Sequence, residues 1–280
     1  MIRVLIVGKK SFIGSNLYTF LKKKYYVKKI SYNDVKKKNT NFFKNYSHII
    51  NCSVNPNYIK LRYNPKFEYD LKIVKKIKNF NIKYIFFSSR KVYRPKFNIK
   101  ENGSLFPVSN YSKNKLITEK KLISIIKKKV LIFRVSNVIG LPIKNNKKKI
   151  HWTFIDDFFE FASKGIIFDN KKSFKDFISI TKFSEIVYLS LKKNIFGVYN
   201  LSIGKKIYLN KLIKWLNFYN QNKCKVLKIR KIHQNKDNFT LNNTKLSKII
   251  SFKYSINDLE KYCKKISKIY FKKKTWKKKL

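Results

Sequence analysis

The sequence is poor in acidic residues, in small residues and in cysteine. Its 280 residues include 14 Asp plus Glu, 7 Gly, 5 Pro, 3 Cys and a single alanine. So few glycines and prolines exclude collagen-like and Gly/Pro-rich low-complexity chains. The cysteines, Cys52, Cys224 and Cys263, are too few and too far apart for a disulfide framework, which fits a reducing cytoplasm. No apolar run approaches the roughly 18 residues that cross a bilayer, so we expect a soluble, cytoplasmic protein without a membrane span.

Apolar and aromatic residues are plentiful. They make up 44% of the chain and include 24 Phe and 18 Tyr. A disordered basic chain lacks the apolar residues that a core requires. The composition therefore indicates a folded protein with one large or two smaller cores.

The formal net charge is +53, because 67 Lys and Arg face the 14 acidic residues. A strongly basic surface is typical of nucleic-acid binding. Arginine is scarce beside lysine, however, although nucleic-acid readers favour its bidentate guanidinium. The lysines are scattered, and the abundant Lys, Ile, Asn, Phe and Tyr are residues with A/T-rich codons. We therefore favour a base-composition bias of the genome and expect no specific nucleic-acid partner.

Apolar runs alternate with amphipathic stretches along the first half of the chain. The runs predict strands at 2–7, 26–32, 48–52, 83–88 and 130–134. The amphipathic stretches predict helices at 15–23, 70–79, 109–127 and about 152–163. This alternation predicts an α/β fold, a doubly wound parallel sheet of Rossmann type. Beyond residue 140 the alternation loosens at a Lys/Asn-rich loop (144–149), which predicts a smaller C-terminal lobe.

The segment GKKSFIG (8–14) joins the first predicted strand to the first predicted helix. A dinucleotide-binding turn needs one glycine for the sharp turn and one for close helix–sheet packing, and Gly8 and Gly14 fit these roles. Ser11 stands where a middle glycine would let the backbone approach the pyrophosphate. We predict that the dinucleotide contacts Gly8, Lys10, Ser11, Phe12, Ile13 and Gly14.

The end of the second predicted strand bears on the choice of dinucleotide. An acidic residue that binds the adenosine ribose of NAD is expected there. The sequence has Ser31, Tyr32 and Asn33, with Asp34 slightly late. Because Lys9 and Lys10 would suit a ribose 2′-phosphate, the segment favours NADP over NAD.

A Tyr and a Lys four residues apart share one helix face. The sequence contains seven such pairs, so the pattern alone selects none of them. Only the pair Tyr111/Lys115 opens a predicted helix after a Pro-containing loop. It also follows by 22 residues Ser89, which ends a predicted buried strand.

With these residues the sequence resembles the extended short-chain dehydrogenase/reductase family, the NAD-dependent epimerases and dehydratases that act mostly on nucleotide sugars. VGKKSFIGSNL is similar to the family's TGxxGFIGxxL, and FFSSRKVY to its SSxxVYG. Further matches follow in family order in YSKNKLITEKKL, FRVSNVIGLP, FKDFISI, GVYNLSIGKKIYLNKL and LNNTKLSKIISFKYSINDLEKYCKKI. The matches cover nearly the whole chain.

The resemblance implies a catalytic set of Ser89, Tyr111 and Lys115. Tyr111 would act as general acid/base while hydride moves to or from the nicotinamide. Lys115 would favour the phenolate and bind the nicotinamide ribose, and Ser89 would hydrogen-bond the reacting oxygen. The resemblance places Cys52 and Ser53 beside the cofactor, and Ser89, Arg90, Asn137 and Lys175 beside the substrate. Arg134 and Lys175 equally fit structural ion pairs.

The resemblance also divides the chain. A cofactor domain is expected at 1–140 with a returning segment at about 173–200, a substrate-binding lobe at 141–172 and 201–270, and a basic tail at 271–280. It implies a nucleotide-sugar substrate used for surface polysaccharide synthesis, and it allows for a homodimer. His48, His151 and His233 are isolated, so no metal site is expected.

One departure narrows the expected reaction. Arg90 and Lys91 stand where the sugar 4,6-dehydratases carry an acidic pair after the catalytic Ser, so a 4-epimerase or a keto-sugar reductase is expected. Ser11 and the absent ribose acid leave open a catalytically degenerate NAD(P)-binding regulatory protein of the same fold. A nucleic-acid-binding protein is the remaining alternative.

Overall fold

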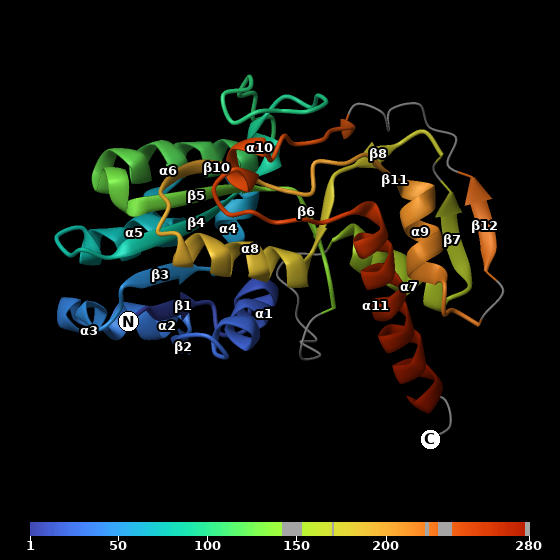
Figure 1. The fold of residues 1–280 in the computed structure, drawn as a ribbon, viewed down its shortest axis with the longest axis horizontal. Coiled ribbons are helices and arrows are strands. Elements are labelled where there is room, and N and C mark those ends of the chain that lie inside the picture. The colour runs from blue at the N-terminus through green and yellow to red at the C-terminus, as the bar shows by residue number, and fades with distance from the viewer. Residues whose placement is uncertain (142–152, 170, 222–223, 229–236, 278–280) are drawn as a thin grey trace.

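The computed structural model describes residues 1–141, 153–169, 171–221, 224–228 and 237–277 (Figure 1). A six-stranded parallel sheet forms its larger part. The strands of this sheet are β1 (Arg3–Val7), β2 (Tyr26–Ile30), β3 (His48–Asn51), β4 (Lys83–Ser89), β5 (Val130–Val135) and β10 (Gly197–Leu201). Across the sheet they follow the order β2-β1-β3-β4-β5-β10, so β2 and β10 are its edges.

The order of the strands fixes where a ligand would bind. Strand β1 has β2 on one side and β3 on the other. The connection from β1 to β2 and the connection from β2 to β3 therefore run in opposite directions along the sheet. Ligands of open α/β sheets bind outside the carboxyl ends of the strands at such a switch point. The predicted doubly wound α/β fold is confirmed, and its switch point lies between β1 and β3.

Helices cover both faces of the sheet, which explains why its inner strands are apolar at consecutive positions. The helices are α1 (Phe12–Leu21), α2 (Tyr32–Lys37), α3 (Thr40–Lys44), α4 (Pro56–Lys60), α5 (Tyr69–Ile77), α6 (Asn110–Ile126), α7 (Phe154–Ser163), α8 (Ile180–Lys192), α9 (Leu209–Asn217), α10 (Thr244–Ser247) and α11 (Ile256–Lys277). Short 3-10 turns are η1 (Pro65–Phe67), η2 (Arg90–Val92) and η3 (Lys127–Lys129). Figure 1 shows α5 and α6 on one side of the sheet and α1 and α8 on the other. Every residue of β3 and β5 is buried, as expected for strands with both faces covered.

Two cores correspond to the two faces. One contains Leu71 and Val74 of α5 with Leu122 of α6. The other contains Leu17 of α1 and Phe183 of α8, and it continues into the C-terminal lobe. The sheet and the lobe therefore share a continuous apolar core.

The C-terminal lobe lies at one end of the sheet (Figure 1). Three strand pairs lie outside the main sheet: β7 (Ile166–Asp169) with β12 (Lys225–Lys228), β8 (Phe174–Lys175) with β11 (Ile207–Tyr208), and β6 (Asn137–Ile139) with β9 (Phe177–Ser179). Helix α9 packs on α11, and Leu212, Trp215 and Leu216 of α9 are buried. The lobe thus has its own strand pair, β7 with β12, and its own helices, and it is joined to the main sheet through the common core.

The predicted strands begin and end within two residues of the observed ones. Helix α1 begins at Phe12, three residues before the predicted start, because Ser11 caps it. The predicted loop at 144–149 lies outside the described residues. Helix α11 continues to Lys277, into the segment expected as a basic tail. Within the described residues, no helix combines the length and apolarity needed to cross a bilayer.

Candidate functional site

The turn between β1 and α1 lies against the end of β3 so closely that only glycine fits at two positions. Gly8 has a φ of +121°, and a Cβ there would lie 2.9 Å from the carbonyl carbon of Cys52. A Cβ on Gly14 would lie 2.6 Å from Ser11 Oγ and 2.8 Å from the carbonyl oxygen of Gly8. The turn therefore has the glycine-dependent shape that a dinucleotide-binding turn requires.

The side chain of Ser11 stabilises the start of the helix that follows it, α1. It is the N-cap of α1, and its Oγ accepts a hydrogen bond of 2.9 Å from the amide of Gly14. Phe12 and Ile13 form the first helical turn, whose amides have no partner within the helix. Such amides and the helix dipole favour a phosphate. A serine at the middle position is thus compatible with an anion-binding helix N-terminus.

Asp34, the acid nearest to the expected ribose position, is engaged in a capping box. The amide and the Oγ of Ser31 donate to Asp34 Oδ2 at 2.9 and 2.8 Å, and the Asp34 amide donates to Ser31 Oγ at 3.2 Å. The hydrogen bonds from Ser31 lower the pKa of Asp34, and the charge of Lys9 lowers it further. The carboxylate that follows β2 is therefore committed to its capping box, and the lysine whose charge acts on it, Lys9, belongs to the turn between β1 and α1.

The residues after β3 form the opposite wall of this turn. The Cys52 amide donates to the Val7 carbonyl at 2.7 Å, which continues the pairing of β3 with β1. Asn51 Oδ1 accepts from the Ser53 amide at 2.9 Å, and Asn51 Nδ2 donates to Asp70 Oδ1 at 2.8 Å. Burial, aided by the charge of Asp70, raises the pKa of the Cys52 thiol. Cys52 is therefore a neutral wall residue.

Tyr111 and Lys115 lie one turn apart at the start of α6. Tyr111 is half-buried, whereas Lys115 is 8% exposed. Lys115 Nζ lies 5.8 Å from the centre of the Tyr111 ring and 4.3 Å from that of Phe86. Helix α6 packs against β4 and η2, so the pair stands at the carboxyl end of the sheet near Ser89.

Ser88 and Ser89 at the end of β4 have different environments, since neighbouring strand residues face opposite sides. Ser88 is buried and donates to Glu119 Oε1. Ser89 is half-buried, and its Oγ accepts from the Lys91 amide at 3.2 Å. Of the two hydroxyls, that of Ser89 is thus the one available to a ligand.

Two buried carboxyl groups accompany Lys115, and sequence patterns did not reveal them. Glu68 is 1% exposed and Asp70 5%. Glu68 Oε1 accepts from the Asp70 amide at 2.9 Å, and Oε2 accepts from the hydroxyl of Thr118 on α6. Burial and the charge of Asp70 raise the pKa of Glu68 to about 7, against the opposing charge of Lys115. In the sequence, the only feature that draws attention to Glu68 and Asp70 is that acidic residues are rare.

Arg134 takes part in a structural ion pair. Its Nη2 lies 2.7 Å from Glu119 Oε2, and Nη1 donates to the hydroxyl of Tyr93 at 2.8 Å. Asn137 Nδ2 donates to the carbonyl oxygen of Asp176 at 3.0 Å, which ties β6 to the segment before β9. The structural ion pair that the sequence left open for Arg134 is therefore observed.

Arg90 and Lys175, both predicted beside the substrate, meet on one carboxylate. Both Nη atoms of Arg90 donate to Asp237, with Nη2–Oδ2 at 2.6 Å, and Lys175 Nζ lies 2.6 Å from the same Oδ2. Asp237 lies in the sequence beyond the lobe's last strand and was not predicted. Lys175 is therefore in an ion pair, as one reading of the sequence expected.

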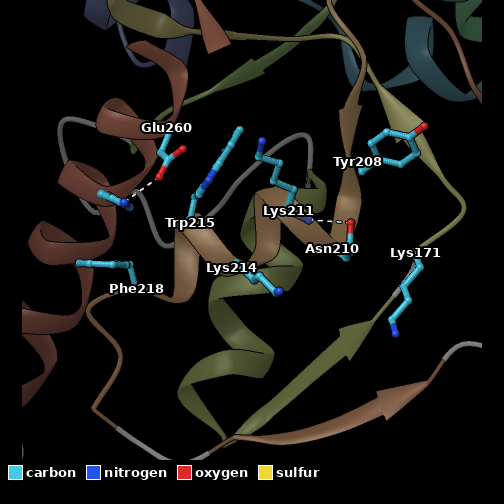
Figure 2. Close-up of a pocket in the computed structure, with 9 residues that line it drawn as sticks. Lys171, Tyr208, Asn210, Lys211, Lys214, Trp215, Phe218 and Glu260 are labelled. Atoms are coloured by element: carbon cyan, nitrogen blue, oxygen red, sulfur yellow. Dashed lines mark hydrogen bonds and ion pairs between the residues drawn. The ribbon is translucent and has the colours of Figure 1, made fainter. Parts of the chain in front are cut away.

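A hollow of about 610 Å³ lies on the outer side of the lobe and shares no residue with the predicted site. Its walls are Lys171, Tyr208, Asn210, Lys211, Lys214, Trp215, Phe218, Glu260 and Lys264. Figure 2 shows Lys171 on the segment between β7 and β8 and the other labelled side chains on or next to α9, α11 and β11, with Glu260 paired to a lysine of α11. Lysines are common over the whole surface, so this hollow does not by itself indicate a ligand.

Comparison with known proteins places these features in a family. The sequence matches the model of the NAD dependent epimerase/dehydratase family over residues 4–202. No curated protein matches the sequence significantly.

Solved structures share the fold over nearly the full chain. The UDP-N-acetylglucosamine 4-epimerase of Methanobrevibacter ruminantium M1, in complex with UDP-N-acetylmuramic acid, superposes with a TM-score of 0.79 at 22% identity, covering 97% of this chain and 98% of that chain. The UDP-glucose 4-epimerase of Thermotoga maritima, with UDP-glucose, gives 0.76 at 17% identity over 98% and 100%. A UDP-glucuronic acid 4-epimerase mutant from Bacillus cereus, with a fluorinated UDP-glucuronic acid and NAD, gives 0.74 at 16% over 95% and 100%. Because the family model matches well over half of the chain, the protein belongs to the NAD dependent epimerase/dehydratase family.

Proposed function

We propose that the protein is an NAD(P)-dependent enzyme that epimerises or reduces a nucleotide-activated sugar. The observation that carries this proposal is the pair Tyr111 and Lys115 at the start of α6, beside the end of β4 where Ser89 lies. The glycine turn 8–14 opens at the same end of the sheet. The proposed cofactor site and the proposed proton-transfer group thus adjoin each other.

Each of these residues has a chemical role in the proposal. The turn residues Gly8, Lys10, Ser11, Phe12, Ile13 and Gly14, with Cys52, Ser53, Tyr111 and Lys115, would hold the dinucleotide. A bound NAD(P) supplies a nicotinamide that exchanges hydride with a sugar carbon. The Tyr111 hydroxyl would exchange a proton with the sugar oxygen, and the nearby Lys115 charge stabilises the phenolate. The Ser89 hydroxyl would hydrogen-bond that same oxygen.

The substrate is proposed to lie between the sheet and the lobe. On this view residues 1–140 and 173–200 bind the cofactor, and residues 141–172 and 201–270 form the substrate lobe. Arg90, Asn137 and Lys175 would face the nucleotide sugar. Because Arg90 and Lys91 replace the acidic pair needed for elimination of water, we propose an epimerase or a keto-reductase rather than a dehydratase. Its product would serve polysaccharide synthesis in the cytoplasm.

Cofactor preference follows from the end of β2. Lys9 approaches Asp34, which is already engaged with Ser31, so a ribose 2′-phosphate finds a cation there. We therefore propose NADP as the preferred cofactor, although similar structures have been solved with NAD.

Titration of the purified protein with NADH and NADPH, followed by nicotinamide fluorescence, tests the proposal. We expect saturable binding, tighter for NADPH, and then turnover of at least one UDP-sugar from a panel of glucose, N-acetylglucosamine and glucuronic acid derivatives. If neither dinucleotide binds, the enzyme proposal fails. Binding without turnover of any nucleotide sugar would favour the regulatory alternative, and tight salt-dependent binding of DNA or RNA instead would favour the nucleic-acid alternative.

A further inference from the structure

Two positive side chains, those of Arg90 and Lys175, hold the carboxylate of Asp237, and Arg90 directly follows Ser89 in the sequence. The Asp237 side chain is 45% exposed, whereas those of its partners Arg90 and Lys175 are 7% and 26% exposed. The anion thus lies at the open side of the cluster and the guanidinium at its closed side. Although partial burial raises the pKa of Asp237, the hydrogen bonds and charges of Arg90 and Lys175 lower it well below its usual range. Asp237 is therefore an anion in this cluster at any physiological pH.

The guanidinium of Arg90 is held in a fixed plane. Its Cζ lies 4.0 Å from the centre of the Phe239 ring, and the residue is 6% exposed. Both Nη atoms bind the Asp237 carboxylate in the bidentate manner that matches a planar carboxylate. The cluster is thus shaped for a carboxylate, and it already holds one.

The cluster has more positive charge than Asp237 can neutralise. Lys91 follows Arg90 directly, and partial burial together with the charge of Arg90 lowers the pKa of Lys91. The charge of Asp237 opposes this effect and that of Lys175 adds to it, so Lys91 lies within the same field. Arg90, Lys91 and Lys175 carry three positive charges near the single negative charge of Asp237, so the field of the cluster remains attractive to an anion.

The position of the cluster relates it to the sugar. Arg90 is the next residue after Ser89, which under the proposed function binds the oxygen at C4. The C6 atom is attached to C5, the ring neighbour of C4, so under the proposed function the substituent at C6 is the one assigned to the side chain that follows Ser89. A hydroxymethyl group there gives Arg90 no charged partner, whereas a carboxylate does.

We propose that Arg90, with Lys91 and Lys175, forms a subsite for a C6 carboxylate, so that the substrate is a nucleotide-linked uronic acid. In the free protein the Asp237 carboxylate occupies this subsite, and the sugar carboxylate replaces it on Arg90. The inference rests on the proposed function and specifies its substrate class. The replacement exchanges one ion pair for another and forms no covalent bond.

The test compares two ligands that differ only at C6. Binding of UDP-glucuronic acid and UDP-glucose is measured by calorimetry at about 0.15 M salt, which screens the general positive charge, with the preferred dinucleotide saturating. We expect UDP-glucuronic acid to bind about 10- to 100-fold more tightly, as a hydrogen bond to a charged group implies. Arg90→Gln abolishes this preference, and Arg90→Lys retains part of it. Arg94→Gln, which alters an exposed arginine stacked on Phe106, leaves it unchanged.

Asp237→Asn separates this proposal from a structural role of the cluster. If Asp237 competes with the sugar carboxylate, the variant binds UDP-glucuronic acid several-fold more tightly and does not gain affinity for UDP-glucose. If the variant loses affinity for both sugars equally, the cluster has only a structural role in holding the lobe to the sheet, and the inference is overturned. UDP-glucose binding without any preference for the uronic acid overturns the inference alone, whereas failure of the folded wild-type protein to bind either sugar overturns the proposed function as well. Thermal unfolding of each variant shows that it is folded.

Discussion

The guanidinium of Arg134 lies on the carboxylate of Glu119, with 2.7 Å between Nη2 and Oε2, and the two side chains are 6% and 2% exposed. Glu119 also accepts from the buried Ser88 hydroxyl. Removing one partner of a buried pair leaves the other charge without compensation. We therefore expect Glu119→Gln to lower the free energy of unfolding by about 3–5 kcal/mol in urea titrations. Glu160→Gln, which breaks the exposed pair with Lys164, is the control and should cost less than about 1 kcal/mol.

Glu68→Gln tests the buried carboxyl near Lys115. The pKa of Glu68 is raised to about 7 in the folded protein, so the folded state holds its proton more firmly than the unfolded state. The contribution of Glu68 to the free energy of unfolding is fully present below its ordinary pKa of 4.5, and it is lost as the pH rises through 7. Because Gln remains neutral, the variant should gain stability over the wild type between pH 5 and 8, by a difference on the order of 3 kcal/mol.

Asp34→Asn is a control for Glu68→Gln, because the pKa of Asp34 is shifted in the opposite direction and its effect on stability should have the opposite sign. The pKa of Asp34 is lowered in the folded protein by hydrogen bonds from Ser31, so its contribution is present at neutral pH and lost in acid. Asp34→Asn should therefore lose stability at pH 8, where Glu68→Gln gains it. If the unfolding free energies of both variants changed with pH in the same way, the pKa directions assigned to Asp34 and Glu68 would be wrong.

His48 makes the fold sensitive to mild acid. Burial, aided by the charge of Lys83, lowers its pKa from 6.5 to about 4, and its Nδ1 is hydrogen-bonded to Ser47 Oγ at 2.9 Å. The unfolded chain binds a proton at higher pH than the folded chain, so stability is lost as the pH falls from 6.5 through 4. The loss should reach about 3 kcal/mol. In His48→Gln the difference in unfolding free energy between pH 7.5 and pH 4.5 should shrink, and an unchanged difference would show that other groups cause it.

Tyr111→Phe tests the proposed acid/base group. The variant should lower kcat by about 10²–10⁴-fold, which is the usual contribution of a positioned acid or base. Dinucleotide affinity, followed by fluorescence, should fall far less than kcat, because Phe keeps the aromatic ring and removes only the hydroxyl. Tyr188→Phe is a matched control because Tyr188 is also followed by a lysine four residues later, on α8. Full activity of Tyr111→Phe would remove Tyr111 from its role.

Gly8→Ala tests the cofactor turn. A side chain at Gly8 meets both a φ of +121° and the Cys52 carbonyl carbon at 2.9 Å. Gly197 also has a positive φ of +99°, but no atom lies within 4 Å of its Cβ position. Gly197→Ala should therefore show only the backbone cost, about 1–2 kcal/mol. Gly8→Ala should in addition lose dinucleotide affinity, measured by fluorescence titration, and equal affinities of the two variants would contradict a cofactor role for this turn.

Local patterns predicted the sheet well because its strands are buried on both faces. Residues 4–7 and 130–133 are continuous apolar segments, and such segments have few alternatives in a globular protein. The start of α1 was predicted too late because capping by Ser11 outweighs the onset of amphipathicity at Ser15. The choice of Tyr111 among seven similar pairs came from its neighbours and from family resemblance.

The long-range partners of three acidic residues were not predictable from local patterns. Glu68, Glu119 and Asp237 find partners 15 to 147 residues away in sequence, in Thr118, Arg134 and Arg90 respectively. Such contacts depend on how helices and loops meet after folding. The secondary-structure preference of a single residue does not predict these long-range contacts.

The edges of the main sheet give the lysine surplus a physical consequence. An open strand edge invites pairing with another chain, and lysines or a covering segment prevent it. Edge strand β2 carries Lys28 and Lys29, and edge strand β10 is covered by α10, whose Lys245 donates to the Val198 carbonyl oxygen at 2.9 Å. Lysines of this surplus thus lie at both borders of the sheet, where they disfavour strand pairing with a second chain.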